Sequence, residues 1–129
     1  MRTNAIRAAL VLPILLVATA CGEEGEVSDG AGAAANAKTA ITVEATDTAC
    51  TLSATEAPTG SIAFTVTNKG SKTTEFYLYE GDKVVGEVEN ISAGLTRTLT
   101  VDAEKAGSYQ TACKPGMKGD GIRGAFTVK

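Results

Sequence analysis

The chain has three cysteines and no histidine, and this combination limits the chemistry it could perform. Without histidine it lacks the residues for Ser-His-Asp or Cys-His catalysis, for a histidine-bound zinc ion and for the usual blue-copper centre. Thiols, carboxylates, tyrosines and thioethers remain, and no pair of them has a spacing that suggests acid–base catalysis. We therefore expect no enzymatic activity. The net charge of −3 also argues against a nucleic-acid partner.

The first of the three cysteines ends a segment that has the pattern of an export signal. Arg2 and Arg7 precede an apolar run, residues 8–17, that is too short to span a membrane. Small residues stand directly before Cys21, and this arrangement resembles the lipobox of bacterial lipoproteins, in which the cysteine is diacylated and becomes the new N-terminus. The alternative is a plain secretory signal with an incidental cysteine.

Three parts follow from this interpretation. We predict a lipoprotein signal peptide over residues 1–20, a flexible tether over 21–40 and one domain over 41–129. The tether prediction rests on a segment rich in glycine, alanine and acidic residues that has no hydrophobic periodicity. A diacyl anchor on Cys21 would hold the protein at the extracytoplasmic or periplasmic face of the cell membrane.

Short runs of alternating apolar and polar residues, rich in β-branched side chains, predict an all-β domain. Their regular spacing favours a Greek-key β-sandwich of seven to eight strands. A glycine-rich loop, residues 114–121, joins the last two predicted strands. Leu95 is expected to point inward, whereas Arg97 falls on the same apolar face without an explanation. The predicted strands cover residues 41–46, 51–55, 61–67, 74–80, 83–89, 95–101, 108–113 and 122–128.

The spacing Gly-x-Tyr-x-x-x-Cys from Gly107 to Cys113, followed by a loop and a final Gly-x-x-x-Val strand, resembles the cupredoxins. That resemblance implies a cupredoxin-like sandwich over nearly all of residues 41–129. A blue-copper centre needs two histidines, a cysteine and a weak axial methionine. Only Cys113 is retained, because the other ligand positions match Glu75, Gly116 and Ile122. A type 1 electron-transfer centre is therefore not expected.

A narrower resemblance is to the EfeO-type cupredoxin-like domain, which belongs to a bacterial iron-uptake system of the cell envelope. It implies metal binding, of iron or copper, at the positions matched by Cys50, Glu75 and Cys113. Met117 could add a thioether for Cu(I). On this hypothesis the protein serves metal uptake or delivery, and an iron-uptake permease or a peroxidase-like protein would be its partner.

The same residues allow a second hypothesis. Two cysteines in an exported domain commonly form a disulfide, and a bridge between Cys50 and Cys113 would make a metal-free sandwich for envelope interaction or structure. Glu75 alternates onto the same face as Tyr77 and Tyr79, which is either a solvated face or the edge of a site near Cys113. Tyr109 is expected to hydrogen-bond the backbone of a loop.

Overall fold

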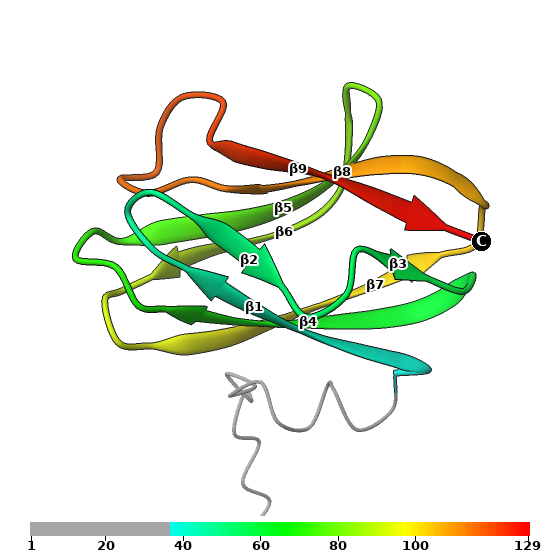
Figure 1. The fold of residues 1–129 in the computed structure, drawn as a ribbon, viewed down its shortest axis with the longest axis horizontal. Helices are drawn as coiled ribbons and strands as arrows, with labels where there is room; N and C mark the ends of the chain where they lie inside the picture. The colour runs from blue at the N-terminus through cyan, green and yellow to red at the C-terminus, as the bar shows by residue number, and fades with distance from the viewer. Residues whose placement is uncertain (1–36) are drawn as a thin grey trace, which may run out of the picture.

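Two β-sheets packed face to face make up the domain (Figure 1). The structure is a computed structural model that describes residues 37–129. The predicted signal peptide, Cys21 and most of the predicted tether lie outside the described residues. Within residues 37–129 all regular elements are strands, so no helix there could cross a membrane.

The smaller sheet has the order β2-β1-β4-β7 and the larger has the order β3-β9-β8-β5-β6. Two pairs, β1 with β4 and β3 with β9, run parallel, and every other pair is antiparallel. The nine strands are β1 (Thr39–Ala45), β2 (Cys50–Leu52), β3 (Glu56–Ala57), β4 (Gly60–Asn68), β5 (Thr74–Glu80), β6 (Lys83–Ile91), β7 (Thr96–Ala103), β8 (Gly107–Cys113) and β9 (Ile122–Val128).

The predicted all-β sandwich is confirmed, with one strand more than expected. The additional strand, β3, has only two residues and pairs with the end of β9. The first strand also begins at Thr39 rather than at Ile41. Both differences arise because backbone pairing extends past the stretch in which apolar and polar residues alternate.

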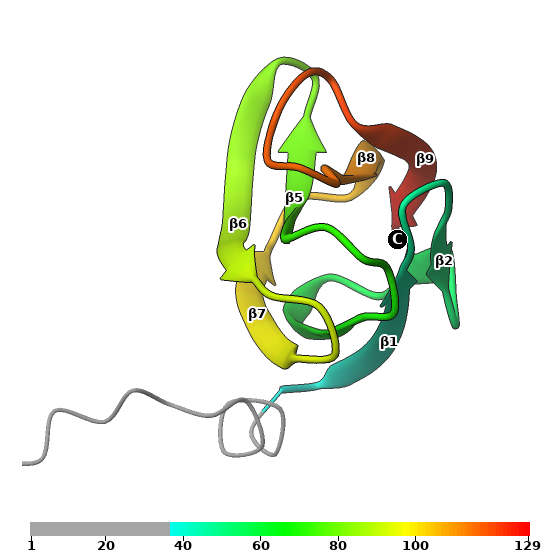
Figure 2. The same cartoon turned by 90° about the vertical axis from the view of Figure 1, so that its left-hand side faces the viewer.

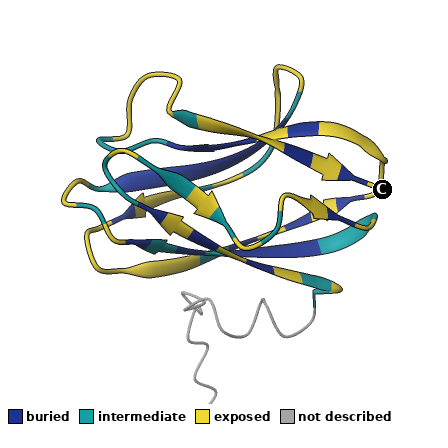
Figure 3. Ribbon diagram, in the orientation of Figure 1, coloured by how far each residue is buried: buried dark blue, intermediate teal, exposed yellow. Residues whose placement is uncertain are grey.

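The core lies between the sheets, where the inward-facing residues of both sheets are buried (Figure 3). Phe64 on the smaller sheet contacts two phenylalanines on the larger sheet. Its ring centroid lies 5.2 Å from that of Phe76 and 5.5 Å from that of Phe126. These aromatic contacts between sheets give the core its largest apolar burial.

Two expectations for β7 are corrected or explained by the structure. Leu95 is 50% exposed because it precedes β7 in a turn, rather than pointing into the core. Arg97 is exposed near the start of β7, which is an edge strand. Its charge therefore stays in solvent although the residue falls on the apolar face.

The two ends of the sandwich differ. The chain enters β1 at one end, whereas four connecting loops gather at the other, which we call the loop end (Figures 1 and 2). Because β1 and β4 run parallel with Ala45 opposite Asn68, both strands finish at the loop end. The loops gathered there are residues 46–49, 69–73, 92–95 and 114–121.

A buried asparagine holds the loop end together. The Asn68 amide nitrogen donates to the backbone carbonyls of Lys72 and Ile91, both at 2.7 Å, and its side-chain oxygen accepts from the Gly70 N–H at 2.9 Å. Asp47 holds the same loop from the other side, since its carboxylate accepts hydrogen bonds from Ser71 and Lys72. These bonds lower the pKa of Asp47.

At the opposite end, Tyr109 makes the predicted bond to a loop. Its hydroxyl donates to the Lys105 carbonyl at 2.7 Å. The ring is 5% exposed, so the tyrosine fills the core while its hydroxyl fixes the turn before β8.

Replacing Asn68 by alanine should lower the free energy of unfolding by about 2–4 kcal/mol, because three hydrogen bonds are lost and buried backbone groups lose their partners. Urea denaturation would measure this change. Ser108→Ala, at an exposed position without a side-chain hydrogen bond, is the matched control and should change stability by less than about 0.5 kcal/mol. Equal stability of the two variants would contradict the role assigned to Asn68.

Candidate functional site

Cys50 and Cys113 form a disulfide that joins the two sheets at the loop end. Cys50 is the first residue of β2 in the smaller sheet, and Cys113 is the last residue of β8 in the larger. Cys113 is completely buried, and Cys50 packs against the core. The two cysteines could have been a disulfide or a pair of metal ligands, and the structure contains the disulfide.

Glu75 lies on the opposite side of the larger sheet from this disulfide. Phe76 pairs with Cys113, and both side chains belong to the core between the sheets. Its neighbour Glu75 alternates onto the outer face, where its carboxylate accepts a hydrogen bond from the Tyr77 hydroxyl at 3.0 Å. The sheet itself thus separates the carboxylate from the two sulfurs.

The fourth predicted metal donor, Met117, lies in the loop between β8 and β9. Its side chain is 42% exposed and its backbone has a φ of 55°, in the left-handed region. The loop reaches the same end of the sandwich as the disulfide (Figure 1). Met117 is thus presented to solvent.

These residues do not fit a blue-copper centre. Histidine is absent from the sequence, and the Cys113 sulfur is bonded to Cys50. Within residues 37–129, no group of three or more cysteine, aspartate or glutamate side chains is placed to hold a metal ion. Binding of iron or copper by Cys50, Glu75, Cys113 and Met117 would require reduction of the disulfide, and it stays a prediction.

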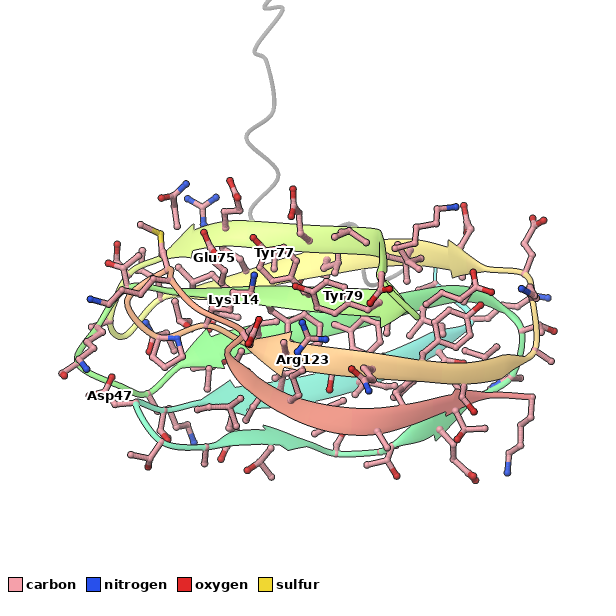
Figure 4. The ribbon with its side chains drawn as sticks, turned by 90° about the horizontal axis from the view of Figure 1, so that it is seen from above. Asp47, Glu75, Tyr77, Tyr79, Lys114 and Arg123 are labelled. Carbon is pink, nitrogen blue, oxygen red and sulfur yellow. A yellow bond between two sulfur atoms is a disulfide. The ribbon has the colours of Figure 1, made fainter. Side chains whose placement is uncertain are left out.

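The structure assembles another set of side chains around Glu75, on the outer face of the larger sheet (Figure 4). Tyr77 and Tyr79 stack with ring centroids 5.5 Å apart and ring planes inclined by 13°. The Lys114 ammonium lies 4.0 Å from the centroid of the Tyr77 ring, and the Arg123 guanidinium carbon lies 4.5 Å from that of Tyr79. Cations in these positions attract the electron-rich ring faces.

Both tyrosines are more buried than a solvated face would leave them. Tyr77 is 8% exposed and Tyr79 is 6% exposed, because the two cationic side chains lie across them. The pKa of Tyr77 is raised, mainly by burial and to a smaller extent by the hydrogen bond to Glu75. Its phenol therefore remains a neutral hydrogen-bond donor.

Sequence reasoning missed the two cations. Lys114 directly follows Cys113, so its position over Tyr77 depends on the register between β5 and β8. Arg123 pairs with Ala112, so its position also depends on the register between β8 and β9. That register is set across the irregular loop 114–121, and the sequence pattern of the strands does not specify it. The only available signal was one cation directly after β8, which pairs with β5, and another in β9, which pairs with β8.

Residues 9–128 match the family of cupredoxin-like domains. This chain belongs to that family. None of the curated proteins matches the sequence. Among cupredoxin-fold structures, reduced auracyanin from Roseiflexus castenholzii is 17% identical, with 72% of this chain and 98% of that chain covered and a TM-score of 0.55. Auracyanin B is 16% identical, with coverages of 72% and 90% and a TM-score of 0.58.

The cupredoxin fold also occurs within larger proteins that resemble this chain. A copper-containing nitrite reductase from Thermus scotoductus is 16% identical and covers 70% of this chain, with a TM-score of 0.52, but only 27% of that enzyme is matched. At these identities the likeness shows the fold alone. The narrower EfeO-type resemblance and the binding of iron remain predictions.

Replacing both Cys50 and Cys113 by serine should lower the free energy of unfolding by about 2–4 kcal/mol, since the bridge closes a long loop in the unfolded chain. The two cysteines are 63 residues apart in the sequence, and closing a longer loop removes more conformational entropy from the unfolded chain. Urea denaturation of the native protein and the double variant, each with and without reductant, would measure the change. Reductant should weaken only the native protein, and equal stability of all four samples would contradict this role.

Proposed function

We propose that this protein is a metal-free cupredoxin-like module of the cell envelope, held at the extracytoplasmic face of the membrane through a lipid on Cys21. Its role is interaction at the membrane surface rather than electron transfer or catalysis. One observation carries this proposal: the Cys113 sulfur, at the position of the family's copper-binding cysteine, is covalently bonded to Cys50.

The anchoring part of the proposal rests on the N-terminal pattern and on the disulfide, which persists in oxidising compartments outside the cytoplasm. The chain enters the sandwich at the end opposite the loop end (Figure 1). An anchor at Cys21, 16 residues before Ala37, would therefore leave the loop end free to point away from the membrane. A link of that length reaches at most about 55 Å.

Uptake or delivery of iron or copper is the second candidate function, with an iron-uptake permease or a peroxidase-like protein as partner. Membership of the cupredoxin-like family favours it. It ranks second because it needs both thiols of Cys50 and Cys113 in their reduced form and a carboxylate from the other face of the sheet.

Native mass spectrometry of residues 22–129, prepared in an oxidising compartment, distinguishes the two candidates. This part of the chain contains the whole core, which runs from Ile41 to Val128. The protein should have the mass of the disulfide form and should retain no metal after it is offered iron or copper and then exchanged into fresh buffer. A metal held stoichiometrically by the oxidised protein would overturn the proposal.

The same measurement after reduction tests the second candidate. One iron or copper ion per reduced chain, lost in Glu75→Gln but kept in Glu87→Gln, would support metal delivery by a thiol form. The Glu87 variant is the matched control because this residue lies on the same face, opposite Tyr77. Absence of metal from the reduced native protein would exclude the second candidate.

A further inference from the structure

The outer face of the larger sheet carries charges of opposite sign on its two sides. The strand order β9-β8-β5-β6 places the tyrosines of β5 between acidic residues on β6 and basic residues at β8 and β9. No other described segment packs over this surface in the two-layer sandwich (Figures 2 and 4). We call it the tyrosine face and define it by Tyr77, Tyr79, Glu87, Glu89, Lys114 and Arg123.

None of the four charged residues that flank the tyrosines forms a salt bridge within residues 37–129. The three salt bridges of that region lie elsewhere, at Glu44, Glu80 and Glu56 with their lysine partners. The guanidinium of Arg123 makes only neutral contacts, with the Gln110 amide oxygen at 3.0 Å and a backbone carbonyl. Two anionic and two cationic groups thus remain available to an external partner.

We propose that the occupant of the tyrosine face is a second copy of this chain, related by a two-fold axis that runs parallel to β5 along the tyrosine pair. Rotation by half a turn about this axis exchanges the two sides of the face. Each acidic row, Glu87 and Glu89, then lies opposite the partner's Lys114 and Arg123. An axis across the strands would instead place acidic rows opposite each other, so the charge pattern selects one geometry.

The exposed apolar surface at this face is small, which predicts a weak dimer. Tyr77 and Tyr79 are largely covered, and Val84, which pairs with Tyr79 and is 43% exposed, adds one apolar contact. Four neighbouring strands of about seven residues cover roughly 450 Å², compared with about 800 Å² per partner in a typical stable interface. We expect a dissociation constant on the order of 10–100 µM at low salt, weakened at least about tenfold by high salt because the contacts are charged.

The proposed axis also agrees with attachment to a membrane. Because it runs along the strands, both chains begin β1 at the same end of the dimer (Figure 1). Two lipid anchors could therefore enter one bilayer, and their shared surface would raise the effective concentration of the two domains. Only this step rests on the proposed function; the charge pattern does not depend on it.

Analytical ultracentrifugation of residues 22–129 from about 5 to about 500 µM, at about 20 mM and about 500 mM salt, tests the dimer. The native protein should associate reversibly at low salt. Glu87→Lys/Glu89→Lys and Lys114→Glu/Arg123→Glu should each lose self-association by at least about tenfold, because like charges then face each other. An equimolar mixture of the two variants should associate again, since all rows become complementary.

Asp102→Lys/Glu104→Lys, a double reversal at exposed positions at the end of β7, is the matched control and should associate like the native protein. A native protein that remains monomeric at the highest concentration and low salt would overturn the proposal. So would a mixture that fails to associate while circular dichroism shows both variants folded. These outcomes are independent of metal content and disulfide state, so they leave the test of the proposed function separate.

Discussion

The covalent bond between Cys50 and Cys113 is the constraint on which the loop end of this sandwich depends. Strand β2 has three residues and pairs only with β1, so hydrogen bonding alone holds it weakly to the sandwich. The disulfide ties it to β8 in the other sheet. The buried Asn68 side chain then fixes the loops beside it through three hydrogen bonds. A covalent bond and a buried amide together hold this end of the sandwich in one arrangement.

The departure from copper chemistry extends to the backbone. Gly116, the position matched to a histidine ligand, has a φ of 76°, a conformation that a histidine would adopt only with strain. The other histidine position is Glu75, whose carboxylate accepts a hydrogen bond from Tyr77 on the outer face. A histidine introduced at position 116 would be strained, and one at position 75 would point to the outer face, away from the Cys113 sulfur in the core.

The sequence predicted the fold class, most of the strands and the Tyr109 bond, since each depends on local alternation or on a short motif. It could not choose between a disulfide and a ligand pair for Cys50 and Cys113, because both require the sulfurs to lie close together. The cover of Lys114 and Arg123 over the tyrosines was missed because it depends on the registers of β8 with β5 and of β9 with β8, which the strand patterns do not specify. The Asn68 side chain was missed because Asn-Lys-Gly is typical of an ordinary turn.

The parallel pairing of β1 with β4 has a mechanical consequence for a domain attached by its N-terminus. A pull on Thr39 acts along β1, across seven paired positions whose evenly spaced, slanted hydrogen bonds are loaded in shear. These bonds share the load instead of opening one after another. The closed disulfide also excludes residues 51–112 from extension, so only the flanking segments could lengthen under tension. The domain is therefore built to transmit force between the end at which β1 begins and its loop end with little stretching.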